Sequence, residues 1–131
     1  MLEERAADVT VIGGGLAGMA ASIHLARAGW EVLCVGPDLS EIPAVGESLD
    51  WSSPALLEAL GLPMEQLIAD DIATYKKHVT LKLSDGSARY YAASEWLGRP
   101  PFNLELRTLH VDRLHLNGAL TRIAMGYGVR Q

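Results

Sequence analysis

The stretch that decides the fold is residues 9–18, which reads VTVIGGGLAG. Its first four residues are a short apolar run of strand formers, as expected for a buried strand of a parallel sheet. Three glycines then break the strand, and an Ala/Leu-rich helical pattern continues to about Ala28. Gly29 follows, at the position past a helix end where a positive φ is common. A second apolar run at residues 32–35 completes a strand, turn, helix and strand, which predicts an α/β fold with a βαβ unit.

The glycine turn has the spacing G-x-G-x-x-G, which is typical of dinucleotide binding when it follows a strand and opens a helix. Gly13 allows the sharp turn, Gly15 leaves the backbone open to a pyrophosphate, and Gly18 lets the helix lie close to the strand. The free N–H groups at the helix start attract phosphate oxygens. We therefore predict that a dinucleotide binds at Gly13, Gly14, Gly15, Leu16, Ala17 and Gly18.

One part of the dinucleotide pattern is missing. The second strand of such folds ends in an acidic residue that binds a ribose hydroxyl, but Gly36 occupies that place. Asp38 and Glu41 are the nearest acids that could reach the ribose, and a backbone group could replace them. Asp38 is the candidate cofactor-binding residue here.

The chain beyond residue 36 departs from a simple NAD-binding domain. We expect a loop at residues 37–52, a short helix with Ser53 as its N-cap, and further helical turns from Met64 to about residue 69. Alternating residues at 79–83 and 88–92 then flank a turn, which predicts an antiparallel hairpin with one exposed face. An NAD-binding domain would continue with a helix and a parallel strand, so this inserted hairpin favours a flavoprotein.

The last third of the sequence predicts a return to the first unit. We expect a loop at residues 94–103 and a strand at 104–106. A helix is expected from about His110 to Met125, because Leu116, Leu120 and Ile123 recur at helical spacing. Another strand should begin at residues 128–131.

Composition narrows the class of protein. The 131 residues are 49% apolar and suit one packed domain, and a single Cys excludes an internal disulfide or a multi-Cys metal site. The net charge of −5 argues against a general nucleic-acid binder. We expect no metal site, because the four His residues lack metal-ligand spacing. An acidic leader at residues 1–8 argues against a secretory signal, and no apolar run is long enough for stable membrane insertion, so a cytoplasmic location is expected.

Taken together, these features resemble the FAD-dependent oxidoreductases that include aromatic hydroxylases, geranylgeranyl reductases and flavin-dependent halogenases. The resemblance rests on residues 8–18, on Val45-Gly46-Glu47-Ser48, on Leu60-Gly61-Leu62-Pro63, and on Val111-Asp112-Arg113 opening a helix. It implies FAD as the cofactor. It also implies that Glu47 and Ser48 lie beside the flavin and that Arg113 meets the cofactor. A turn stabilised by Ser48 or Asp50, and a surface salt bridge for Arg113, are the alternatives.

A further similarity concerns Lys76. The stretch Ala73-Thr74-Tyr75-Lys76 is similar to the one in which tryptophan halogenases carry the lysine that handles the halogenating species. The resemblance therefore implies that Lys76 and Glu47 are candidate catalytic residues. Lys77 beside it leaves the register open, and two solvated lysines before a strand are the alternative.

These expectations divide residues 1–131, a single N-terminal FAD-binding region, into four parts. Residues 1–36 form the βαβ dinucleotide unit, and residues 37–76 hold the Gly-Glu-Ser loop and short helices. Residues 77–109 form the hairpin and loop of the substrate domain, and residues 110–131 form a helix that returns to the nucleotide domain. The expected fold is a Rossmann-type FAD/NAD(P)-binding unit with an inserted antiparallel hairpin, and it is incomplete.

The resemblance implies an oxidoreductase of the monooxygenase or halogenase type. Its substrate would be a small molecule, aromatic or isoprenoid, and its electrons would come from a separate flavin reductase or from NAD(P)H. Hydride transfer of the geranylgeranyl-reductase kind is the alternative within enzymes. Full members are several times longer and complete the flavin site with a later Gly-Asp segment. A nucleotide-binding remnant or truncated fragment without turnover is therefore the alternative for this chain.

Overall fold

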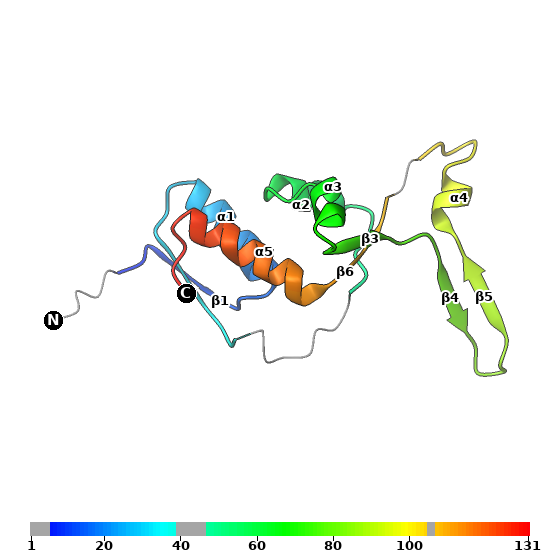
Figure 1. Cartoon of the computed structure of the whole chain (residues 1–131), viewed down its shortest axis with the longest axis horizontal. Helices are drawn as coiled ribbons and strands as arrows, with labels where there is room; N and C mark the ends of the chain where they lie inside the picture. Colours follow the sequence, from blue (N-terminus) through cyan, green and yellow to red (C-terminus); the bar gives the residue numbers. More distant parts are fainter. Residues whose placement is uncertain (1–5, 39–46, 105–106) are drawn as a thin grey trace.

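The computed structural model describes residues 6–38, 47–104 and 107–131 (Figure 1). Strands β1 (Val9–Ile12) and β2 (Val32–Val35) pair in parallel, and helix α1 (Leu16–Arg27) connects them. Gly29 follows the helix with a φ of +93°, which releases the chain into β2. The predicted βαβ unit is confirmed.

A third parallel segment lies on the far side of β2. The backbone N–H of Arg130 donates to the carbonyl of Val32 at 3.0 Å, and the carbonyl of Arg130 accepts from the N–H of Cys34 at 2.8 Å. Helix α5 (Arg113–Gly126) leads to this segment and packs side by side with α1 (Figure 1). The strand expected to begin after residue 128 is thus confirmed at its first residues.

The core of this unit lies between the two helices and one face of the sheet. Its largest fully buried side chains include Met19 and Ile23 from α1, and Leu116 and Leu120 from α5. The other face of the sheet is not covered by the described residues, since Ile12 on β1 is 89% exposed.

A second small layer adjoins this unit. Helices α2 (Ser53–Ala59) and α3 (Met64–Ala69) precede strand β3 (Ala73–Tyr75), which pairs antiparallel with β6 (Leu109–Val111). The N-cap of α2 is Ser52 rather than the predicted Ser53.

Asp50 explains this shift in the start of α2. Its side chain accepts hydrogen bonds from the backbone N–H groups of Ser52 and Ser53 at 3.0 and 3.2 Å, and from both hydroxyl groups. These bonds lower the pKa of Asp50, with the side-chain bond from Ser52 as the largest cause. The carboxylate therefore satisfies the donors at the helix start that the cap residue itself leaves open.

The inserted hairpin consists of β4 (Val79–Lys82) and β5 (Ala88–Tyr91), followed by α4 (Ala93–Leu97). It protrudes from the body of the molecule at the right of Figure 1. Every residue of both strands is exposed, so the buried face that the sequence predicted is not covered within the described part of the chain. Residues 94–97, the first part of the expected loop at 94–103, belong instead to helix α4.

The last helix starts later than predicted. Residues 109–111 form β6, with Leu109 and Val111 buried and His110 exposed between them, which is the alternation of a strand. Asp112 then caps α5 by accepting from the N–H of His115 at 3.0 Å. The strand expected at residues 104–106 is wrong for Leu104, which lies outside any strand, and its other two residues lie outside the described ones.

Candidate functional site

The glycine turn joins β1 to α1 as a dinucleotide site requires. Gly13 has a φ of +113°, and its N–H donates to the carbonyl of Val35 at 2.7 Å, which aligns the turn with the end of β2. Gly15 is the N-cap of α1, has an extended backbone, and supplies no capping side chain. Leu16 and Ala17 form the first turn, whose N–H groups lack helical partners and suit a phosphate.

Three glycines around this turn differ in what a side chain would meet. A Cβ on Gly18 would lie 1.6 Å from the carbonyl oxygen of Gly13, and a Cβ on Gly36 would lie 2.7 Å from the nitrogen of Gly14. A Cβ on Gly15 would meet nothing within 4 Å. Gly18 and Gly36 are therefore required for packing, whereas Gly15 leaves open space at the helix start. The contact at Gly36 also explains the missing acid, because no side chain fits there.

A cavity of about 520 Å³ adjoins the turn. The end of β2 and the residues after it, including Gly36 and Asp38, form one side, and α5 forms the other. Asn117 on α5 lines this cavity, and its buried Oδ1 atom has no hydrogen-bond partner among the residues that the structure describes. A buried acceptor of this kind is costly unless a donor reaches it, so a ligand hydroxyl or amino group fits here.

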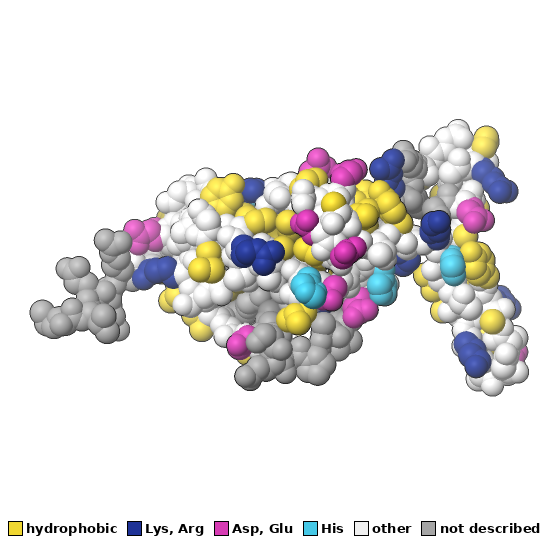
Figure 2. Space-filling model, in the orientation of Figure 1, with side chains coloured by type: hydrophobic (Ala, Val, Ile, Leu, Met, Phe, Trp, Pro, Cys, Tyr) yellow, Lys and Arg dark blue, Asp and Glu magenta, His cyan; other side chains and the backbone are white. Residues whose placement is uncertain are grey.

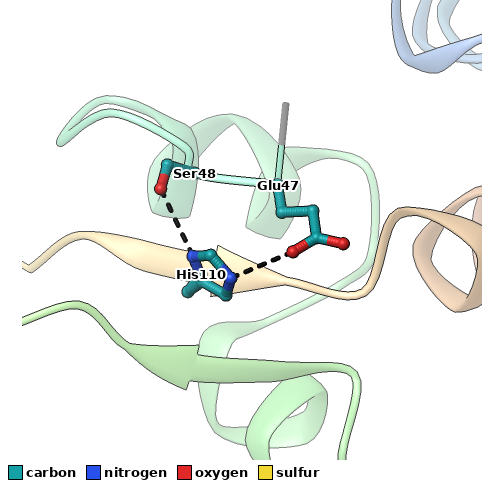
Figure 3. A network of polar contacts seen from close by, with 3 residues as sticks. All are labelled: Glu47, Ser48 and His110. Carbon is teal, nitrogen blue, oxygen red and sulfur yellow. Dashed lines mark hydrogen bonds and ion pairs between the residues drawn. The ribbon is translucent and has the colours of Figure 1, made fainter. Parts of the chain in front are cut away.

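Glu47 and Ser48 are not among the residues that line this cavity. The carbonyl of Glu47 accepts from the N–H of Val111 at 2.8 Å, and the N–H of Leu49 donates to the carbonyl of Leu109 at 2.9 Å. The segment 47–49 therefore pairs with β6. We call Glu47 and Ser48 the acidic corner. Both side chains contact the ring of His110, as Figure 3 shows.

This corner borders a second, smaller cavity of about 260 Å³. Glu47, His110 and Asp112 are among its lining residues. Acidic and His side chains also gather in the middle of the face shown in Figure 2. Asp112 has a lowered pKa, first because it accepts the backbone N–H of His115 and next because it contacts the His115 ring at 2.9 Å.

The structure distinguishes the two adjacent lysines. The Nζ of Lys76 donates to the carbonyl of Leu49 at 3.3 Å, and the backbone of Lys76 pairs with Thr108. Lys77 is exposed. Lys76 is therefore the lysine that reaches the segment carrying the acidic corner.

Asp38 and Arg113 are the remaining predicted residues. Asp38 lines the larger cavity. Arg113 is half-buried and is the first residue of α5, between the lining residues of the two cavities. Sequence reasoning missed Asn117 and His110. Neither residue belongs to a sequence motif. Each lines a cavity whose walls come from segments far apart in the chain.

A family model described as FAD binding domain matches residues 8–92. The chain belongs to the FAD-binding domain family. FAD is its cofactor, and the open space at Gly15 and the unpartnered acceptor of Asn117 both fit that group. No curated protein matches this FAD-binding domain in sequence.

Several solved structures share the fold of this FAD-binding domain. A flavin-dependent brominase is 24% identical with a TM-score of 0.70, over 95% of this chain and 28% of its own. The myxobacterial chondrochloren halogenase is 22% identical with a TM-score of 0.71, over 94% and 27%. A geranylgeranyl bacteriochlorophyll reductase-like protein from Thermoplasma acidophilum is 19% identical with a TM-score of 0.68, over 95% and 29%. The domain thus has the Rossmann-type fold of these proteins and spans less than a third of their length.

Within residues 6–38, 47–104 and 107–131, no helix is long and apolar enough to cross a membrane. Nor does any group of three His, Cys, Asp or Glu side chains there have the arrangement to hold a metal ion.

Proposed function

We propose that this chain is the FAD-binding segment of a flavin-dependent oxidoreductase of the monooxygenase or halogenase type. The observation that carries the proposal is the hydrogen bond from Lys76 to the carbonyl of Leu49. It brings a primary amine to the segment that holds Glu47 and Ser48, which supports the resemblance to halogenases.

The glycine turn binds the pyrophosphate of FAD through the N–H groups at the start of α1. Asp38 and Asn117 face the adenosine part from the two sides of the larger cavity. Arg113 lies where α5 begins, and its positive charge suits the phosphates.

The acidic corner and Lys76 serve the flavin half and the substrate. Bound FAD supplies the redox chemistry, while the protein supplies binding, orientation and charge. Glu47 presents a carboxylate that can accept a proton, and Lys76 presents an ammonium that can donate one. The substrate is a small aromatic or isoprenoid molecule, and the electrons come from a separate flavin reductase or from NAD(P)H.

A second candidate is a nucleotide-binding remnant without turnover. Two observations favour it: both strands of the hairpin are exposed, and Ile12 on the bare face of the sheet is 89% exposed. A third candidate, reductase-type hydride transfer, draws on the fold shared with the reductase-like protein.

The first experiment is a titration of the purified chain with FAD, followed by flavin fluorescence. Binding at micromolar affinity supports the cofactor site. A folded sample that does not bind FAD overturns the enzyme proposal for this chain and leaves the remnant.

The second experiment separates the lysines. The chain is given reduced FAD, O₂ and bromide with a panel of phenols and indoles, and brominated or hydroxylated products are measured by mass. Lys76→Met is expected to lower product formation at least about 100-fold if the amine transfers a proton. Lys77→Met is the matched control and should retain wild-type yields. Equal yields from both variants would exclude the catalytic role of Lys76.

A further inference from the structure

We propose that His110 is the positioning residue of the acidic corner: its imidazole fixes the carboxylate of Glu47 and the hydroxyl of Ser48 for the flavin half of FAD. The inference rests on the proposed function, which places these two residues beside the flavin. Nothing in the sequence motifs assigns a role to His110.

The two contacts of the ring determine how its hydrogens are arranged. His110 Nε2 lies 3.1 Å from Oε2 of Glu47, and His110 Nδ1 lies 3.3 Å from Oγ of Ser48 (Figure 3). An ionised carboxylate only accepts hydrogen bonds, so Nε2 carries the hydrogen and donates it to Glu47. In the neutral ring Nδ1 is then an acceptor, and the hydroxyl of Ser48 donates to it. One imidazole thus fixes both side chains at once.

The backbone hydrogen bonds alone do not fix the side chain of Glu47. Hydrogen bonds from Leu49 to Leu109 and from Val111 to Glu47 fix the main chain of segment 47–49 on β6. They leave the side-chain torsions of Glu47 free, and a Glu side chain that is half exposed has many rotamers in water. The contact with His110 selects one of them.

The position of His110 is fixed by strand β6 and its two neighbouring segments. It lies in β6 between the buried side chains of Leu109 and Val111, so the alternation of the strand turns its ring to the surface. It also pairs with Thr74 of β3 on one side and bridges Ser48 on the other. The ring is therefore carried by the central strand of a three-segment antiparallel arrangement.

The test compares FAD with ADP, which contains the adenosine and pyrophosphate of FAD and lacks the flavin. His110→Ala is expected to weaken FAD binding about three- to tenfold, as for the loss of one or two hydrogen bonds, with ADP binding unchanged. His110→Gln, whose amide reaches about as far as Nε2, should recover most of the loss. His24→Ala, at an exposed His on α1, is the matched control and should bind both ligands normally.

A double-mutant cycle tests whether His110 acts through Glu47. If it does, His110→Ala costs less FAD affinity in the Glu47→Ala background than in the wild type, and the loss that remains reflects the contact with Ser48. Independent losses that multiply would overturn the positioning role. So would equal losses of FAD and ADP affinity, because these would indicate a general structural effect.

Different experimental results would overturn the role of His110 and the proposed function. If Gly15→Val abolishes FAD binding while His110→Ala and Glu47→Ala change nothing, the cofactor site stands and the role of His110 is overturned. If the wild-type chain, folded by circular dichroism, binds neither FAD nor ADP, the proposed function itself fails.

Discussion

Gly18 and Gly13 approach each other so closely that a single methyl group would not fit between them. A Cβ on Gly18 would lie 1.6 Å from the carbonyl oxygen of Gly13, well inside any van der Waals contact. The turn and the first turn of α1 therefore form one packed unit, which fixes where the helix N–H groups point. Gly15, three residues earlier, has no neighbour within 4 Å of such a Cβ.

This contrast predicts two different phenotypes. Gly15→Val should fold normally and lose FAD binding, because its side chain enters only the space that the pyrophosphate needs. Gly18→Ala should lose about 1–3 kcal/mol of unfolding free energy, because the backbone must move apart. Urea denaturation and FAD titration of both variants distinguish the effects. Retained FAD affinity in Gly15→Val would exclude the site.

Asn117 should matter for the adenosine half of the cofactor. Asn117→Ala removes an acceptor that lines the larger cavity, so we expect FAD and ADP affinities to fall by the same factor, about two- to tenfold. Gln66→Ala is a control, because Gln66 lies on α3, away from the cavity, and its amide donates to Asp70 at the end of that helix. A loss of FAD affinity without a loss of ADP affinity would contradict the assignment.

Leu120 tests the packing of α5 on the core. Its side chain is 1% exposed, so Leu120→Ala should lower the free energy of unfolding by about 2–5 kcal/mol. Leu114, on the same helix and 46% exposed, provides the matched variant, and Leu114→Ala should cost less than about 1 kcal/mol. Urea unfolding followed by circular dichroism measures both, and equal losses would be inconsistent with this core.

Asp112 should make stability depend on pH at acidic values. Its pKa in the folded chain lies below the ordinary 3.8, chiefly because the backbone N–H of His115 donates to it. A lowered folded pKa adds stability that is present above the unfolded pKa and lost as pH falls through the folded pKa. The difference in stability between wild type and Asp112→Ala should therefore be full above about pH 5 and shrink below pH 4. A difference that stays constant down to pH 2 would refute this.

The sequence predicted the parts of the fold that depend on neighbouring residues. The βαβ unit followed from apolar runs and the glycine turn, and the hairpin followed from alternation around a turn. The helical turns predicted from Met64 to about residue 69 are confirmed as α3. These features have local causes: the positive φ that glycine permits at Gly13, the side-chain period of a strand, and the residues that begin a helix.

Other features depend on contacts between distant segments and could not be read from the sequence. The sequence places residues 110 and 111 in the following helix, because the pairing partners of β6 lie far away at residues 47–49 and 73–75. For the same reason His110 was given no role. The contact of Lys76, rather than Lys77, with the Leu49 carbonyl also depends on distant segments.

The position of Arg130 beside β2 has a consequence for biosynthesis. Its partners, Val32 and Cys34, leave the ribosome long before it does, and α5, which lines the larger cavity, is also made late. Gln131, which lines the cavity and donates to the sulfur of Met19, is made after Arg130. In the nascent chain the glycine turn is therefore made before the residues of α5 and Gln131 that line the other side of the larger cavity. Such distant pairings form slowly, so cofactor capture follows synthesis of this region rather than accompanying it.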